Sequence, residues 1–449
     1  MIGKEKLLSF LKQGLRKARF PQTEIFAYAQ NLRAIRFANS TVHQPMEETN
    51  VNFGVKVIRN GKIGYASVNG LDLERLANAV QEAETSASLP QALPYLESFA
   101  EPKPIEPVNS FSRLTDEAES SKLVDKVKLM FKHGNGTGGT FAGILWSVSG
   151  ETGVLNTNGV ELYHPFTAVN CQAVFTKEDL SGFSAQAASD LSKIDPEKIA
   201  DASVHRALRF KEAHSLPPGE YTCLLDEYAT AELLLYLAYI AFSAEAVETG
   251  SSIIGLKQGE KIADSKVTIS DNAYNPLTFQ SPFDVEGVPR KKVVFIDRGI
   301  AKSVVHDRFT AHKFKTESTG HAVPFDFSEG PLPLNLEMAE GESSKEELLK
   351  QIKRGLLITR FHYIRVVHPL KTMVTGMTRD GVFLVENGEI VSRIKNFRFT
   401  EGILNAFSKV KAVSKNRKLV TFGEVGFPAG ILAPKVLTEN FSFTGTTHF

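Results

Sequence analysis

The feature that most constrains the fold of this 449-residue chain is an abrupt boundary at Leu216-Pro217-Pro218-Gly219. Two consecutive prolines followed by a glycine interrupt regular structure, because proline donates no backbone hydrogen bond and glycine is conformationally free. Beyond this boundary, a strand-like segment at Tyr221–Leu225 leads into an apolar stretch at Tyr228–Val247. Many short strand patterns and glycine-rich turns then follow up to Phe449. The boundary therefore separates two regions of different character.

Ahead of the boundary, helical and strand patterns alternate. Strand patterns at Glu24–Arg33 and Ala34–Asn39 follow an opening helix, and we expect a tight turn between them. Asn60-Gly61 lies between two alternating segments and predicts a β-hairpin. Asp72 precedes an amphipathic stretch and predicts the N-cap of a helix. The first region therefore combines helices with antiparallel strands.

A proline-rich segment at residues 88–110 predicts a linker or an extended strap. A second unit follows, with a helical pattern at Thr115–His133 and strand patterns at Thr140–Ser149 and Thr152–Thr157, separated by a turn at Gly150. We predict an α+β fold in which a two-part N-terminal α/β region precedes a β-rich C-terminal domain. The expected domains are residues 1–110, which include the strap, residues 111–215 and residues 216–449.

Composition argues against several function classes. The 52 Lys and Arg residues and 51 Asp and Glu residues give a net charge of +1, so we expect no nucleic-acid partner. The apolar stretch at Tyr228–Val247 contains Glu232 and Glu245, and we interpret it as a buried core helix rather than a membrane span. Two cysteines in apolar runs and the absence of a signal-peptide pattern predict a cytoplasmic protein without a membrane partner.

The sequence contains no complete catalytic motif. Gly134–Gly139 matches G-x-G-x-x-G, but a helix precedes it and a strand follows, the reverse of the order needed to bind a dinucleotide. The closest histidine pairs, His306/His312 and His362/His368, are six residues apart. Six residues of strand span roughly 20 Å, which is too far for one metal ion. We predict no catalytic residues and no metal site.

Polar loops of the C-terminal half supply the candidate binding residues, because loops on a rigid scaffold often carry function. The loops are Ser281–Gly287, Thr316–His321 and Pro331–Leu336. Turn formation explains the same residue types, so that alternative stays open. The candidates for a substrate cleft or a subunit interface are Ser281, Phe283, Asp284, Glu286, Ser318, Thr319, His321 and Asn335.

Several segments, in order along the chain, resemble the TldD/PmbA family, whose members are also described as modulators of DNA gyrase. The C-terminal matches include LPPGEYTCLLDEYATAELLLYL (216–237), GSSIIGLKQGEKIAD (250–264), SPFDVEGVPRKKVVFIDRGI (281–300), TESTGHA (316–322), PLPLNLEMAEGESSKEELLKQIKRGLLIT (331–359) and FLVENGEI (383–390). Looser matches are RFANS (36–40), GVKVIRNGKIGYASVNGLD (54–72) and NTNGVELYH (156–164). The resemblance covers nearly the whole chain.

The resemblance implies a heterodimer that acts as a peptidase on small or unfolded peptides, in peptide maturation and antitoxin degradation. One subunit, of the TldD type, carries His-Glu-x-x-x-His on the helix that follows the LPPGEY-like strand. A cysteine near the C-terminal end completes its zinc site. The other subunit, of the PmbA or TldE type, lacks these residues.

This chain is similar to the second type. The corresponding helix, at residues 231–252, has no histidine, and the first ligand would fall around Leu235-Tyr236, close to Glu232. No cysteine follows Cys223. We therefore expect a zinc-lacking, non-catalytic subunit without a cofactor, with zinc only in a TldD-type partner. The chain would form this heterodimer, or a homodimer, and contact a peptide substrate.

Two other functions stay open from the sequence. The first is a modulatory protein that binds another macromolecule, as the gyrase-modulator description of the family suggests. The second is a peptidase with a metal-free site built on Asp284, Glu286 and Glu232.

Overall fold

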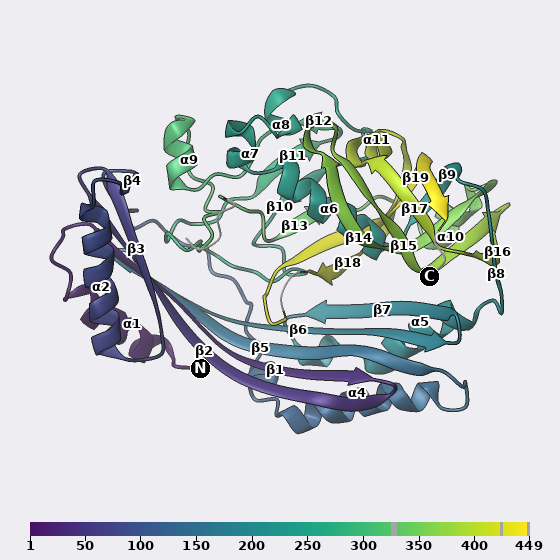
Figure 1. Ribbon diagram of the computed structural model, residues 1–449, viewed down its shortest axis with the longest axis horizontal. Helices are drawn as coiled ribbons and strands as arrows, with labels where there is room; N and C mark the ends of the chain where they lie inside the picture. Colours follow the sequence, from purple (N-terminus) through teal and green to yellow (C-terminus); the bar gives the residue numbers. More distant parts are fainter. Residues whose placement is uncertain (325–329, 423–424, 447–449) are drawn as a thin grey trace.

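The structure, a computed structural model, describes residues 1–324, 330–422 and 425–446 (Figure 1). A long, curved N-terminal sheet lies beneath a β-rich C-terminal domain, and helices pack on the sheet's outer face (Figure 1). This arrangement confirms the predicted α+β fold, with a two-part α/β region before a β-rich domain. Among the described residues, no helix has the length and apolar character needed to cross a membrane.

The N-terminal sheet has seven antiparallel strands in the order β4-β3-β2-β1-β5-β6-β7. Their bounds are β1 (Thr23–Ala38), β2 (Thr41–Arg59), β3 (Lys62–Asn69), β4 (Leu93–Pro94), β5 (Thr140–Asn156), β6 (Glu161–Lys177) and β7 (Leu180–Ala188). Because β1 pairs with both β2 and β5, the two parts of the N-terminal region share one continuous sheet.

Alternation along β1 gives each face of this sheet a different partner, because successive strand side chains point to opposite faces. Ile25 and Ile35 lie on the face that the helices cover. Ile25 packs in the cluster that includes α1 and α2, and Ile35 packs in the cluster that includes α4 and α5. Leu32 and Ala34 point to the opposite face and pack with Leu432 of the C-terminal domain. The helices of this region are α1 (Lys4–Leu15), α2 (Leu73–Ser88), α3 (Arg113–Asp116), α4 (Ser120–Gly134), η1 (Leu191–Lys193) and α5 (Pro196–Leu208).

Two of the predicted local signals are confirmed. Asn60 and Gly61 have positive φ angles of 49° and 67° at the tip of the β2–β3 hairpin, as a two-residue turn requires. Asp72 caps α2 by accepting hydrogen bonds from the backbone N–H groups of Glu74 and Arg75.

Two predicted turns are wrong. The chain does not turn between Arg33 and Ala34, because β1 runs through both residues and pairs with β2 and β5 on its two sides. It also does not turn at Gly150, which lies inside β5 directly opposite Phe166 of β6. The Phe166 ring occupies the space beside this glycine, where an added Cβ would lie 2.3 Å from the ring. In both places strand pairing overrides the local turn signal.

The C-terminal domain is built on a 12-stranded sheet with the path β12-β11-β10-β13-β19-β9-β14-β15-β16-β8; off this path, β17 pairs with β15 and β19, and β18 pairs with β19. Its strands are β8 (Ala213–His214), β9 (Gly219–Leu225), β10 (Ile269–Asp271), β11 (Val293–Asp297), β12 (Ile300–Ala301), β13 (Leu336–Met338), β14 (Arg354–His368), β15 (Met373–Glu386), β16 (Glu389–Ile394), β17 (Phe397–Gly402), β18 (Val410–Thr421) and β19 (Gly430–Thr446). Its helices are α6 (Glu227–Ala241), α7 (Ala244–Glu248), α8 (Ile253–Leu256), α9 (Arg308–Lys313), α10 (Lys345–Lys350), η2 (Pro369–Lys371) and α11 (Ile403–Ser408).

The apolar stretch expected to form one core helix forms two, α6 and α7. The break lies at Phe242-Ser243, where the Ser243 hydroxyl accepts from the Glu245 backbone N–H and begins α7. Ser243 also forms an isolated bridge with Val305, so its backbone pairs across the domain rather than along a helix. α6 itself is buried over most of its surface and packs against β14 and β19.

Close packing of helices on the sheet depends on glycines in β3 and β7. A Cβ at Gly64 would lie 2.0 Å from the carbonyl oxygen of Ala83 in α2, and one at Gly182 would lie 2.1 Å from that of Ser203 in α5. Both obstacles are helix backbone, so neither can move without shifting its whole helix. Helix and sheet therefore approach more closely here than a side chain permits.

We expect Gly64→Ala to destabilise the protein by about 2 kcal/mol or more, because the new methyl group overlaps the α2 backbone. Urea unfolding measures the change. Gly54→Ala is the matched control, since its Cβ would meet only the Tyr65 ring at 3.4 Å. Equal stability of the two variants would contradict this account of the packing.

Candidate functional site

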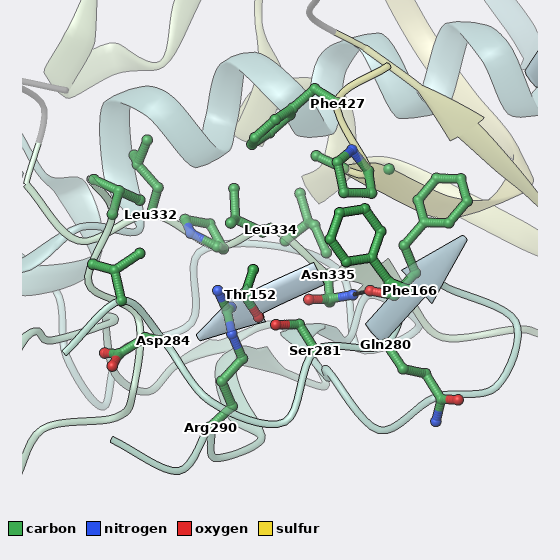
Figure 2. Close-up of a pocket in the computed structure, with 18 of the residues that line it drawn as sticks. Thr152, Phe166, Gln280, Ser281, Asp284, Arg290, Leu332, Leu334, Asn335 and Phe427 are labelled. Carbon is green, nitrogen blue, oxygen red and sulfur yellow. Dashed lines mark hydrogen bonds between the residues drawn. The ribbon is translucent and has the colours of Figure 1, made fainter. Parts of the chain in front are cut away.

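A cavity of about 520 Å³ lies between the N-terminal sheet and the C-terminal domain (Figure 2). One wall comes from the upper face of the sheet, including Phe26 of β1 and Phe166 of β6. The opposite wall comes from α6, which contributes Leu235, and from loops of the C-terminal domain that contribute Phe283 and Leu334. A partly open, mostly apolar space with a few polar groups is typical of a site for small molecules or peptide side chains.

Several predicted site residues line this cavity, namely Ser281, Phe283, Asp284, Asn335 and Leu235. Six others, Glu286, Ser318, Thr319, His321, Glu232 and Tyr236, are not part of its lining. The three predicted loops therefore do meet at one place, but many of their polar side chains turn away from the open space to hold the loops together.

Asp284 organises the first of these loops. Its Oδ1 accepts from the backbone N–H groups of Glu286 at 3.0 Å and Val288 at 2.9 Å, and its Oδ2 accepts from that of Ala322 at 2.9 Å. Burial, and then the adjacent Glu286, raise the pKa of Asp284 to about 7. Asp284 therefore ties the loop that follows Ser281 to the segment that follows His321.

A buried histidine–aspartate pair joins the other two loops. His321 Nε2 donates to Asp271 Oδ1 at 3.0 Å, and Asp271 Oδ2 accepts from the Asn335 backbone N–H at 2.7 Å. His321 Nδ1 lies 2.9 Å from the Thr319 carbonyl oxygen and the same distance from its hydroxyl. Burial lowers the pKa of His321, although Asp271 acts in the opposite direction. The pair is fully enclosed and fixes the loops rather than facing a ligand.

The remaining polar residues of these loops have similar structural contacts. Thr319 Oγ1 accepts from the His306 backbone N–H at 2.8 Å, and the Ser318 hydroxyl donates to the His306 carbonyl oxygen at 3.3 Å. The Asn335 side-chain amide donates to the Phe279 carbonyl oxygen at 2.6 Å. The Ser281 hydroxyl donates to the Phe283 carbonyl oxygen at 3.2 Å. These residues shape the wall of the cavity.

Glu286 joins the C-terminal domain to the N-terminal region. The Tyr95 hydroxyl, from the proline-rich segment, donates to Glu286 Oε1 at 2.6 Å, and Lys56 Nζ of β2 lies 3.7 Å from the same oxygen. Glu24 of β1 completes this buried cluster, with its Oε1 4.0 Å from Lys56 Nζ. Neither carboxylate oxygen of Glu24 has a hydrogen-bond partner among the described residues. Burial raises the pKa of Glu24 to about 7.

α6 turns Glu232 and Tyr236 away from the cavity that it borders. Leu235, Ala238 and Tyr239 line the cavity. Glu232 instead accepts a hydrogen bond from the Phe361 backbone N–H, and the Tyr236 hydroxyl donates to the Ile364 carbonyl oxygen at 2.7 Å. Burial raises the pKa of Glu232 to about 8. Glu232 therefore faces β14 and does not join Asp284 and Glu286 in one acidic site.

A serine–histidine pair also borders the cavity, but its protons are arranged unfavourably for nucleophilic catalysis. His164 Nε2 lies 3.0 Å from Ser110 Oγ and 3.3 Å from the Gln280 carbonyl oxygen. Because a carbonyl only accepts, the tautomer that satisfies Gln280 has its proton on Nε2, and in that tautomer Nε2 cannot take a proton from Ser110. The Ser110 hydroxyl donates to the Pro165 carbonyl oxygen at 3.1 Å.

Sequence reasoning missed two charged residues at this site, Asp271 and Arg290. Arg290 lines the cavity and is only 5% exposed. It is followed by Lys291 and Lys292, so the run of three cations has the pattern of a solvated surface. Asp271 ends the three-residue strand β10, and the sequence there shows only a single acidic residue with no motif around it.

Profiles of known families identify this architecture. The profile described as the PmbA/TldA metallopeptidase C-terminal domain matches residues 218–445, which is more than half of the chain. The profile described as PmbA/TldA metallopeptidase domain 1 matches residues 23–87. The chain belongs to the TldD/PmbA family.

Named relatives in this family include metalloproteases. One from Methanocaldococcus jannaschii is 30% identical over 233 residues, 49% of this chain and 49% of the relative. A metalloprotease named as a TldD homologue, from Buchnera aphidicola subsp. Acyrthosiphon pisum, is 28% identical over 206 residues, 44% of this chain and 42% of the relative. The chain spans about half the length of the curated relatives it matches.

Solved structures of similar fold cover nearly the whole chain. TldE from Thermococcus kodakarensis has a TM-score of 0.88 at 23% identity and covers 98% of this chain and 99% of that one. A protein from Thermotoga maritima, described as a candidate modulator of a DNA gyrase, has a TM-score of 0.86 at 23% identity, with 98% and 100% covered. At this level of identity the likeness establishes the fold alone.

A metallopeptidase family implies a metal ion, but the described residues of this TldD/PmbA chain do not fit one. Within residues 1–324, 330–422 and 425–446, no group of three or more His, Cys, Asp or Glu side chains is arranged to hold a metal. Leu235 and Ala238 present hydrocarbon to the cavity, and hydrocarbon donates no electron pair to an ion.

The buried Glu24 generates a pH prediction. Its carboxyl binds protons more strongly in the folded state than when unfolded, so stability falls as pH rises from about 4.5 to about 7 and then levels off. Glu24→Gln removes this titration, and Lys56 keeps Glu286 as a counter-ion. We expect the variant to have the same stability as wild type at pH 4. At pH 8 we expect it to be more stable, by up to about 3 kcal/mol.

Urea unfolding across this pH range measures the difference. Glu161→Gln is the control, because Glu161 forms an exposed pair with Lys12 and its loss leaves the buried cluster intact. Parallel stability profiles for wild type and Glu24→Gln would contradict the assignment.

Proposed function

We propose that this chain is the zinc-lacking, non-catalytic subunit of a TldD/PmbA-type metallopeptidase complex that acts on small or unfolded peptides. The named relatives support a peptidase-like or modulatory function at the level of the family. The further step, from family member to non-catalytic subunit, depends on the chemistry of α6.

The observation that carries this proposal is the set of side chains that α6 turns toward the cavity. The resemblance places the first zinc ligand of a TldD-type subunit around Leu235-Tyr236. In this chain Leu235 lines the cavity, while Tyr236 donates its hydroxyl proton to the backbone of β14. A zinc peptidase needs three protein ligands and an open position for water, and hydrocarbon supplies neither. The chain keeps the helix and the cavity without the metal-binding groups.

A catalytic partner needs a surface to bind, and the tip of the β14–β15 hairpin offers one. Tyr363 is 65% exposed and Val367 is 53% exposed, with Val366 and Leu370 beside them in sequence. Leu256 of α8, which is 61% exposed, lies on the helix that packs against η2 in the same hairpin. We call these five side chains the hairpin patch. Several exposed apolar side chains at one hairpin tip and on the helix beside it can supply a protein–protein contact.

The proposed occupant of the hairpin patch is the zinc-bearing TldD-type subunit. The hairpin is attached directly to the helix that borders the cavity, through the Tyr236 hydroxyl and the Ile364 carbonyl oxygen. A subunit seated on the patch would therefore contact the element that lies next to the cavity. This position suits a partner that shares a substrate chamber with this chain.

We expect the purified chain to show no peptidase activity and less than one zinc ion per ten chains. Mixed with a TldD-type subunit from the same cell, it should form a complex that contains zinc and cleaves unfolded casein peptides. Elemental analysis and a fluorogenic peptide assay give the two readouts. The matched control is the same partner with alanines in its zinc motif. Cleavage by this chain alone in the presence of a chelator would overturn the proposal.

We also expect Tyr363→Ser combined with Val367→Ser to weaken association with the TldD-type subunit at least tenfold, because the central apolar contacts of an interface carry much of its affinity. Sedimentation or calorimetry measures the affinity, and thermal unfolding checks the fold. The control pair, Leu93→Ser with Leu114→Ser, removes apolar side chains that are 62% and 50% exposed in the N-terminal region. Equal weakening by both pairs would contradict this assignment, and a homodimer disrupted by the first pair would assign the hairpin patch to self-association.

A further inference from the structure

Arg290 places a positive charge in the wall of the cavity. Its side chain is 5% exposed, and neither Nε nor Nη1 has a hydrogen-bond partner among the described residues. Figure 2 shows the side chain extending into the space between Asp284 and Ser281, toward Thr152. A guanidinium stays ionised at all ordinary pH values, so this charge cannot be removed by loss of a proton.

The carboxylates around Arg290 already accept hydrogen bonds from other groups. Asp271 uses one oxygen for His321 and the other for the Asn335 backbone N–H. Asp284 uses both oxygens for backbone N–H groups of its own loop and of Ala322. Both acids attract the guanidinium electrostatically, but neither forms an ion pair with it in the described structure. Nε and Nη1 of Arg290 are therefore available to a molecule that enters the cavity.

An unpaired charged donor in an apolar space is unfavourable, because it has lost its hydration without gaining a partner. A ligand that brings an anionic oxygen to Arg290 would remove this cost, and the low local dielectric would strengthen the attraction. A single cation suits a single negative charge. The surrounding Phe166, Phe283, Leu332 and Leu334 suit a hydrocarbon body attached to that charge.

We propose that the cavity binds a carboxylate carried on an apolar group, with Arg290 as the residue that receives the carboxylate. The C-terminal end of an apolar peptide has this chemistry, and so does a free aliphatic acid. The peptide form rests on the proposed function, since it assigns the cavity to a peptide end. The carboxylate site itself does not depend on a partner subunit, because all of its residues belong to this chain.

Binding to the isolated chain tests this site. The probes are acetyl-Ala-Leu-Phe with a free carboxyl terminus, its C-terminal amide, decanoate and decanol. At pH 6 the probe carboxylate is ionised, whereas Asp284, whose pKa burial and Glu286 raise to about 7, is largely protonated. Calorimetry gives affinities. Fluorescence of Trp146, the only tryptophan, is a second readout, because it packs in one cluster with the cavity residues Phe166 and Phe279.

We expect at least one acid to bind roughly 10- to 100-fold more tightly than its uncharged analogue, as a hydrogen bond to a charged group allows. Arg290→Met should remove this preference and leave affinity for the uncharged analogue unchanged. Arg290→Lys keeps the charge with different donor geometry and should retain part of the preference. Lys291→Met is the matched control, because it removes a neighbouring charge that pairs with exposed Glu317 at 2.6 Å.

Thermal unfolding shows whether each variant folds, and Arg290→Lys keeps the test valid if Arg290→Met does not. Binding of the peptide acid would support the peptide source, whereas binding of decanoate alone would support the same site for a free acid. The site is overturned if neither acid is preferred over its analogue, or if Arg290→Met binds like wild type. Failure to form a complex with a TldD-type subunit would affect the proposed function and leave this result unchanged.

Discussion

Burial of both faces of the N-terminal sheet is the constraint on which the rest of the structure depends. Helices cover the face that carries Ile25 and Ile35, and the opposite face, with Leu32 and Ala34, must find another apolar cover. The C-terminal domain supplies it, through residues such as Leu432. The contact between the two regions includes a cavity as well as a core. The candidate site therefore lies between domains, where neither domain alone could form it.

The buried polar residues of this contact have two separate tasks. The carboxylate oxygens of Asp271 and Asp284 accept hydrogen bonds from the loops that form the wall, so both residues have a structural role. By contrast, neither Nε nor Nη1 of Arg290 donates a hydrogen bond to the described residues. A buried ionised group without hydrogen-bond partners is unusual, because desolvation is unfavourable and such groups normally acquire partners. This contrast distinguishes a residue that holds the site from one that awaits a ligand.

Local signals predicted much of the fold and less of the site. Asn60-Gly61 and Asp72 act within a few residues, so the sequence alone was sufficient for the hairpin and the helix cap. Gly150 also has a turn signal, but its strand pairs on both sides and Phe166 fills the space beside it, which depends on residues distant in sequence. The polar residues of the site loops made these loops predictable from the sequence. Which side chains face the cavity is set by tertiary packing, and for that reason Arg290 was missed.

The position of α6 does not depend on a metal ion in this chain. At its start, Asp226 accepts from Arg206 of α5 at 2.7 Å and also pairs with Lys435 of β19, which contacts Glu227 as well. Burial opposes ionisation of Asp226, but Lys435 and Arg206 together hold its pKa well below the usual value. Further along, Tyr236 bonds to β14. A helix fixed by ion pairs and side-chain hydrogen bonds can carry Leu235 and Ala238 on its cavity face without losing its position, so this family fold does not need a bound metal ion to hold α6 in place.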